Sequence, residues 1–172
     1  MCSGRTRRWR RPWLDSEDKP LVEFEIVVPA VPRHLDQLHE ALARLWGEVD
    51  RLWSRRPDPV WRAEFATGVG EIADNIVQHA YSTSPPGMLT CRLRVFDHAV
   101  EACFTDTGTA YVPSSTTARD EPDDPMSLLE SGRGLALAEA TVDELTYTRA
   151  PGGLNQWCLR KRSLSVDSRS AE

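Results

Sequence analysis

The segment EIADNIVQHAY, residues 71–81, combines a helical pattern with the polar side chains of a candidate site. Glu71, Asn75 and His79 recur every four residues, and because such a step turns only about 40° around a helix, they form one stripe roughly 12 Å long. A carboxylate that can act as a base thus lies beside an amide that can bind Mg²⁺. A solvated helix face with chance polar residues is the alternative, which this segment alone does not exclude.

Helical periodicity extends outward from this segment in the N-terminal direction. A helix is predicted over 60–81, ending at the Ser-, Pro- and Gly-containing run 82–87. Apolar residues at steps of three and four between Leu35 and Leu52 predict an earlier helix, which stops before Pro57. The chain therefore has two consecutive helices before its next strand.

Strands are predicted on both sides of this helical pair. Alternating apolar residues mark strands at 21–28, 88–96, 100–105, 144–149 and 155–161. The last four form two predicted hairpins, which are separated by a loop over 107–131 and a helix beginning at Gly132. Because strands and helices do not alternate, we expect an α+β fold: a two-layer sandwich with a mixed, mostly antiparallel sheet covered on one face by helices.

Two further motifs suggest nucleotide chemistry. Asp106-Thr107-Gly108 follows a strand, where the carboxylate can accept a hydrogen bond from the exocyclic amine of a base and Gly108 can let the backbone approach a planar ring. In Gly132-Arg133-Gly134, a glycine turn is predicted to open a helix with free N–H groups facing anionic oxygens, and Arg133 adds positive charge. Taken singly, an ordinary Asp-x-Gly turn and a flexible helix start remain alternatives.

In this order, the motifs resemble those of the GHKL ATPase superfamily, and within it the anti-sigma-factor serine kinases of the RsbW type. Residues 71–81 are similar to that family's N-box, and Asp106-x-Gly108 resembles its adenine-binding box. Gly132-x-Gly134 resembles the phosphate-binding box, and 107–131 corresponds to the ATP lid. The resemblance covers residues 21–161 and implies a Bergerat ATP-binding fold.

The resemblance also implies roles for the site residues. Asn75 would bind Mg²⁺ and Glu71 would act as general base, while the position of His79 on the same helix stripe predicts that it faces the phosphates of ATP. The implied substrate is a serine on an anti-anti-sigma protein, which competes with a sigma factor for a kinase that is often a homodimer. A non-catalytic module that sequesters a sigma factor or another regulator is the second hypothesis. It is favoured by Ala110, which stands where the family has a second glycine and implies weakened nucleotide binding.

Composition limits the other classes of function. The chain has 172 residues and a net charge of −5, which is unlike the basic surface of a nucleic-acid-binding protein. No apolar run approaches the roughly 20 residues of a membrane span. We expect a flexible basic tail over 1–19, a histidine-kinase-like ATPase domain over 20–162 and a flexible tail over 163–172.

The cysteines bear on the expected compartment. Cys91, Cys103 and Cys158 lie in predicted strands, are not arranged as metal ligands, and are predicted to be buried free thiols. Free thiols suit a reducing cytoplasm. A sensor histidine kinase core is disfavoured, because the chain lacks a dimerisation helix with a phosphoacceptor histidine.

Overall fold

The computed structural model describes residues 19–82, 85–112 and 125–163. Within these ranges, five strands form one antiparallel sheet in the order β1-β2-β3-β5-β4. The strands are β1 (Val22–Pro29), β2 (Met88–Val95), β3 (Ala99–Asp106), β4 (Glu144–Arg149) and β5 (Asn155–Arg162).

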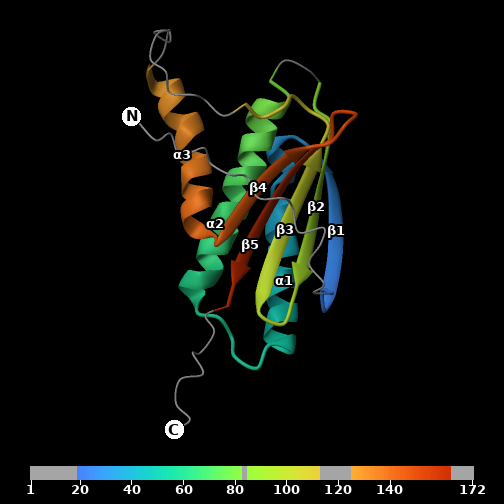
Figure 1. Ribbon diagram of the computed structural model, residues 1–172, viewed down its shortest axis with the longest axis vertical. Coiled ribbons are helices and arrows are strands. Elements are labelled where there is room, and N and C mark those ends of the chain that lie inside the picture. The colour runs from blue at the N-terminus through green and yellow to red at the C-terminus, as the bar shows by residue number, and fades with distance from the viewer. Residues whose placement is uncertain (1–18, 83–84, 113–124, 164–172) are drawn as a thin grey trace, which may run out of the picture.

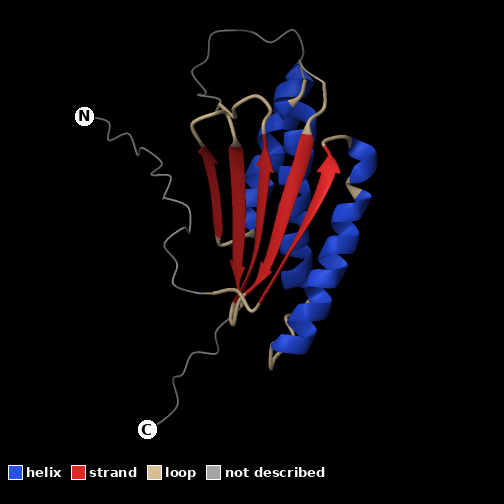
Figure 2. Ribbon diagram, turned by 90° about the vertical axis from the view of Figure 1, so that its right-hand side faces the viewer, coloured by secondary structure: helices blue, strands red, loops and turns tan. Residues whose placement is uncertain are grey.

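Three α-helices cover one face of this sheet (Figure 2). They are α1 (Asp36–Leu52), α2 (Pro59–Asn75) and α3 (Pro125–Thr141), and a short 3₁₀ turn, Pro32–His34, leads into α1. The predicted α+β sandwich is confirmed, and the sheet is antiparallel throughout the described residues.

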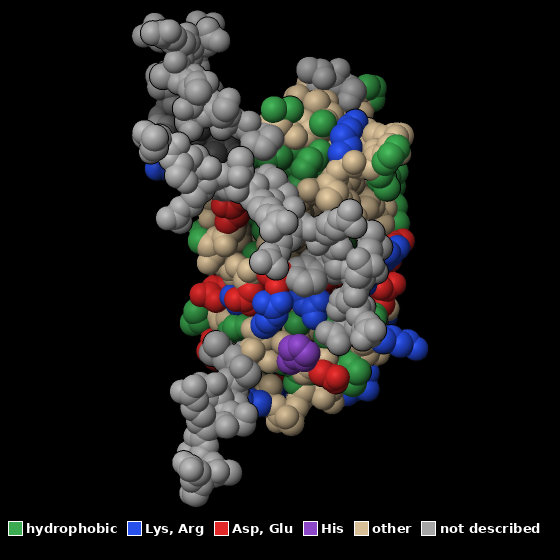
Figure 3. All heavy atoms as spheres, viewed as in Figure 1, with side chains coloured by type: hydrophobic (Ala, Val, Ile, Leu, Met, Phe, Trp, Pro, Cys, Tyr) green, Lys and Arg blue, Asp and Glu red, His purple; other side chains and the backbone are tan. Residues whose placement is uncertain are grey.

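The apolar alternation in the strands decides which sheet face meets the helices. Phe24 and Val28 of β1, Leu93 of β2, Phe104 of β3 and Trp157 of β5 are buried in the core below the helices. The other face carries charged pairs between neighbouring strands, including Arg92–Glu25 and Arg94–Glu101, each at 2.8 Å. Acidic and basic side chains accordingly lie side by side in the space-filling view (Figure 3).

Helix α2 begins with a capped turn and packs closely against α3. The Asp58 carboxylate accepts a hydrogen bond from the Trp61 N–H at 2.9 Å, and Pro59 occupies the first helical position, where a missing N–H costs nothing. A Cβ on Gly68 would lie 3.0 Å from Thr141 and from Val142, so this glycine lets the two helices approach. This packing fixes α2 as the central helix beside the sheet (Figure 1).

Two expected helix boundaries need correction. The α-helix predicted to reach residue 81 ends at Asn75 and continues as a π-helix, Ile76–Ala80. The helix predicted to open at Gly132 begins at Pro125, so the predicted loop 107–131 is partly helical. Pro125 suits the first turn of a helix, and the Met-Ser-Leu-Leu-Glu run after it carries the helical conformation into the glycines.

The thiol prediction is also wrong in part. Cys103 and Cys158 lie directly opposite each other in the β3–β5 register and form a disulfide, whereas Cys91 is a buried thiol whose pKa is raised by burial. Alternation placed each cysteine in a strand, but it could not tell which strands are neighbours. This disulfide removes part of the argument for a reducing compartment.

Two other expectations concern the ends of the chain and membranes. Residues 1–18 and 164–172 of the predicted tails lie outside the described residues. No helix in the described ranges has the length and apolar content that crossing a bilayer requires.

Candidate nucleotide-binding site

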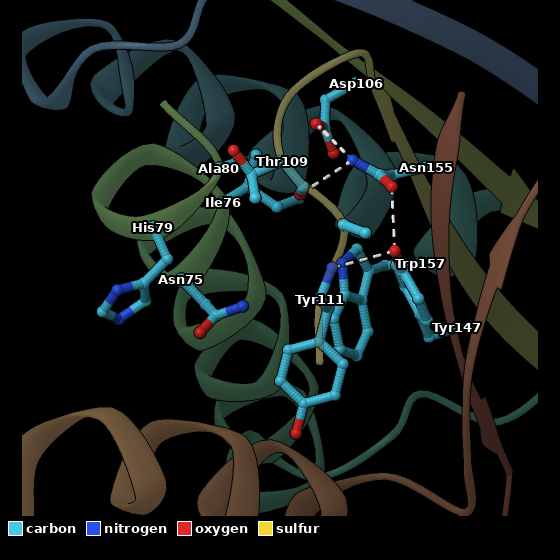
Figure 4. Close-up of a pocket in the computed structure, with 11 residues that line it drawn as sticks. Asn75, Ile76, His79, Ala80, Asp106, Thr109, Tyr111, Tyr147, Asn155 and Trp157 are labelled. Atoms are coloured by element: carbon cyan, nitrogen blue, oxygen red, sulfur yellow. Dashed lines mark hydrogen bonds between the residues drawn. The ribbon is translucent and has the colours of Figure 1, made fainter. Parts of the chain in front are cut away.

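The end of α2 presents Asn75 to a small hollow beside the sheet. Asn75 is half-buried and lines this hollow, and its carboxamide has no hydrogen-bond partner among the described residues. In Figure 4 the carboxamide points toward Tyr111, whereas the His79 ring at the rim points away from Asp106. His79 lies in the π-turn that continues α2, and such turns recur at functional sites.

Asp106 lies at the end of β3, where its side chain is only 2% exposed. Its Oδ1 atom accepts hydrogen bonds from the Gly108 N–H at 2.7 Å and from Asn155 Nδ2 at 2.9 Å. Its Oδ2 atom receives no hydrogen bond from any described residue, and the side chain lines the hollow. A buried acceptor is thus available for a ligand that can donate an N–H group.

The hollow itself has a volume of about 40 Å³. This is room for roughly three water molecules, so a purine ring needs the walls to move. The Tyr111 ring forms part of the wall and packs edge-on against Trp157, with centroids 5.0 Å apart. A larger hollow of about 490 Å³ lies beside Trp53, Arg55 and Asp97 and contains none of the predicted site residues.

Gly108 permits a close approach within the chain itself. A Cβ at this position would lie 2.5 Å from the backbone oxygen of Ala80, and the Thr109 N–H donates to that oxygen at 2.7 Å. The glycine therefore lets the loop approach the π-turn closely, and its approach to a planar ring stays a prediction. Ala110, the residue that departs from the family pattern, also lines the hollow.

Glu71 and Gly134 meet at the other end of the site. A Cβ on Gly134 would lie 2.5 Å from Glu71 Oε2, so the first and third motifs are neighbours. Glu71 is half-buried and forms no hydrogen bond or ion pair among the described residues. Gly132 and Arg133 lie within α3. The prediction that their backbone N–H groups stand at a helix start is therefore wrong.

Three residues of this region escaped the sequence argument. Asn155, Tyr147 and Arg149 belong to the last hairpin and form hydrogen bonds with Asp106 or with the loop after it. Their only sequence signal was a position beside the turn 151–153, which does not indicate which side chains point toward another strand. In the described ranges, no three His, Cys, Asp or Glu residues are grouped as metal ligands. The oxygens of Asn75 and Glu71 are nevertheless the hard donors that Mg²⁺ accepts.

The antiparallel sheet and its single helical layer place the Asp106 carboxylate and the helix residue Asn75 in the wall of one hollow, an arrangement that suits a nucleotide-binding domain. The family model for the histidine kinase-like ATPase domain matches residues 28–161, and the chain belongs to this family, whose domains bind ATP. The chain is also similar to the serine-protein kinase RsbW of Bacillus subtilis (strain 168). The two are 26% identical over 141 residues, which is 75% of this chain and 79% of RsbW.

Proposed function

We propose that the chain is an ATP-binding anti-sigma factor and serine protein kinase that phosphorylates an anti-anti-sigma partner in a bacterial partner-switching system. The observation that carries this proposal is the unpaired Oδ2 atom of buried Asp106, in a hollow that Asn75 also lines. Membership of the histidine kinase-like ATPase family supports ATP as the ligand, and the similarity to RsbW supports the choice of kinase and partners.

In this proposal, ATP spans the two ends of the site. The exocyclic amine of adenine donates to Asp106 Oδ2, and the Asn75 oxygen binds Mg²⁺. The phosphates lie toward Gly132–Gly134, and Arg133 and His79 offset their charge. Because α3 begins at Pro125, we expect its first turns to open when ATP binds, freeing the N–H groups of the glycines.

Glu71 acts as the general base for transfer. Its carboxylate takes the proton of the partner's serine hydroxyl as that oxygen attacks the γ-phosphorus, and ADP leaves. Bound Mg²⁺ would neutralise charge on the phosphates. The absence of hydrogen-bond partners for Glu71 among the described residues supports this role, because the carboxylate is available to a substrate.

A non-catalytic binding module of the same fold is the second candidate. The small volume of the hollow and Ala110 at its wall favour this alternative. In either case, we expect the chain to act in the cytoplasm, as a monomer or a homodimer, with a sigma factor and an antagonist competing for it.

The test combines calorimetry with phosphoryl transfer. The wild type is titrated with Mg-ATP and then incubated with labelled ATP and its cognate single-domain antagonist. We expect Glu71→Gln to bind ATP normally and to lose transfer by roughly 10²- to 10⁴-fold, the usual contribution of a general base. Asp74→Asn, which changes an exposed carboxylate on the same helix, is the matched control and should behave as wild type.

The outcomes separate the two candidates. Absence of both binding heat and a thermal shift with the wild type would exclude the nucleotide site. Binding without transfer to any antagonist favours the regulatory module. Transfer that persists undiminished in Glu71→Gln removes the base role from this residue.

A further inference from the structure

We propose that Asn155 is a positioning residue, which holds the Asp106 carboxylate so that one of its oxygens faces the nucleotide base. This inference rests on the proposed ATP site and adds a residue to it. Asn155 opens β5 directly opposite Asp106, the last residue of β3, and is only 1% exposed.

The hydrogen bonds of Asn155 are all made to the protein itself. Its Nδ2 atom donates to Asp106 Oδ1 at 2.9 Å and lies 3.1 Å and 3.3 Å from the carbonyl oxygens of Gly108 and Thr109. Its Oδ1 atom accepts from the Tyr147 hydroxyl at 2.8 Å and from the Arg149 guanidinium. A primary amide has two N–H groups and one oxygen with two lone pairs, so no capacity remains for a ligand. Asn155 therefore acts through Asp106 and the loop after it.

The effect on Asp106 follows from counting its acceptors. Oδ1 is engaged by the N–H of Gly108 and by Asn155, which fixes the carboxylate plane from two sides. Oδ2 is then the atom left for an incoming base. Without Asn155, the carboxylate keeps only the Gly108 contact and can turn about its side chain, so the acceptor is no longer held in place.

The same amide also fixes the wall of the hollow. Through Tyr147, whose hydroxyl accepts the Tyr111 N–H at 3.0 Å, Asn155 is connected to the end of the described loop (Figure 4). Arg149 adds a contact to the Gly108 carbonyl at 3.2 Å. One buried side chain thus sets both the acceptor and the backbone beside it.

Asn155→Asp gives the most specific test, because it exchanges the donor facing Asp106 for a second carboxylate. Two carboxylates at this distance are not both ionised readily and share a proton at low pH, which restores a donor between them. The other titratable or charged groups near the pair are the Arg149 guanidinium and the Tyr147 hydroxyl, which contact position 155, and His79, which lines the hollow with its ring pointing away from Asp106. Because wild type and variant share all three, the comparison isolates position 155.

The full chain is titrated with Mg-ATP between pH 5.5 and pH 8, and the nucleotide-free protein is melted over the same range. For Asn155→Asp, we expect affinity at least about 10-fold below wild type at pH 8, with partial recovery at pH 5.5, and a melting temperature that follows the same course. Asn155→Leu should lose affinity equally at every pH. The control Gln156→Glu, one position along on the opposite sheet face, should match wild type.

Each outcome is decisive. Affinity of Asn155→Asp that equals the Gln156→Glu control at pH 8 overturns the proposal, as does a loss that is identical at all pH values. If Asn155→Asp does not fold, Tyr147→Phe replaces it: loss of the hydroxyl between Tyr111 and Asn155 should weaken ATP binding about 3- to 10-fold, and unchanged binding overturns the proposal. Wild type that binds no ATP defeats the proposed function instead, while the melting series still decides whether Asn155 holds Asp106.

Discussion

The two ends of the candidate site are built in opposite ways. The base half is the end proposed to hold the nucleotide base, and it comprises Asp106, Gly108, Tyr147 and Asn155. Its polar groups are hydrogen-bonded to one another. At the phosphate half, comprising Glu71, Asn75 and Gly132–Gly134, the side chains of Glu71 and Asn75 have no polar partner among the described residues.

The polar groups of the base half are therefore held in place before a ligand binds, whereas those of the phosphate half are available to a ligand. The base half belongs to the hydrogen-bond network that holds the strand ends together, so a change there should lower stability and affinity at once. The phosphate half holds groups whose partners are a ligand, so a change there should alter the reaction and leave stability intact. The following predictions test this separation.

Gly134→Ala should produce the largest effect, a loss of reaction rate without any loss of stability. The new Cβ would lie 2.5 Å from Glu71 Oε2, and the flexible end of that side chain can move aside. We expect phosphoryl transfer to fall about 100-fold, because displacement of a catalytic group by about 1 Å has effects of this size. The melting temperature should rise by roughly 2–4 °C, since alanine suits a helix interior better than glycine by up to about 1 kcal/mol.

Gly47→Ala is the matched control for this change. Its Cβ would meet nothing within 4 Å in α1, so it should raise the melting temperature and leave transfer unchanged. Normal transfer in Gly134→Ala would mean that the position of the Glu71 carboxylate does not limit the reaction.

The Cys103→Ser/Cys158→Ser double variant should produce the largest loss of stability. The disulfide joins β3 and β5, the strands whose ends carry Asp106 and Asn155. We expect the free energy of unfolding, measured with denaturant, to fall by about 2–4 kcal/mol, and ATP affinity to fall with it. Cys91→Ala keeps the disulfide and serves as control. Equal stability of wild type with and without reductant would contradict a contribution from this bond.

Gly108→Ala should be milder and should again affect stability and affinity together. The added Cβ would lie 2.5 Å from the backbone oxygen of Ala80, where only a backbone shift can relieve the contact. Overpacking of this kind costs about 1–3 kcal/mol of stability, and the shift carries the hydrogen bond between Gly108 and Asp106 with it. Gly70→Ala, whose Cβ has open space, is the control. Weakened affinity without any loss of stability would break the proposed link between the two.

The contrast between the halves also explains what the sequence could predict. Periodicity located all five strands and the first two helices, because alternation and helical spacing depend only on residues close in the chain. The motifs identified Asn75 and Asp106 as neighbours of one hollow. Each of these two residues belongs to a short motif whose members are close in the chain, so local signals could single it out.

The contacts between strands were beyond local signals. The contact of Asn155 with Asp106 and the Cys103–Cys158 bond both depend on the pairing of β3 with β5. No residue pattern within either strand indicates that pairing. The start of α3 differs from the prediction for another reason. The glycines suggest a helix start at Gly132, whereas Pro125 and the apolar residues after it favour an earlier first turn. The π-turn at Ile76–Ala80 was also beyond the sequence pattern, because apolar spacing does not distinguish one π-turn from a continued α-helix.

Asp58→Ala should have the smallest effect and gives the baseline for the comparison. It removes the side-chain cap of α2, a contact worth about 1 kcal/mol, so the melting temperature should fall by roughly 2–4 °C. The cap lies about 25 Å from Asn75 along the helix, given 1.5 Å per residue. ATP affinity should therefore stay at the wild-type value in calorimetry, and Asp58→Asn, which keeps a capping oxygen, should change neither quantity.

The outcome decides how the larger effects are interpreted. If the loss of stability in Asp58→Ala, far from the site, also weakens ATP binding, affinity follows general stability. The losses of affinity in Gly108→Ala and in the cysteine variant are then not specific to the base half. If affinity is unchanged in Asp58→Ala, the joint loss in those variants reports on the hydrogen-bonded strand ends themselves. A preorganised base half requires the second result, because its network acts through the geometry of Asp106, which the cap of α2 does not touch.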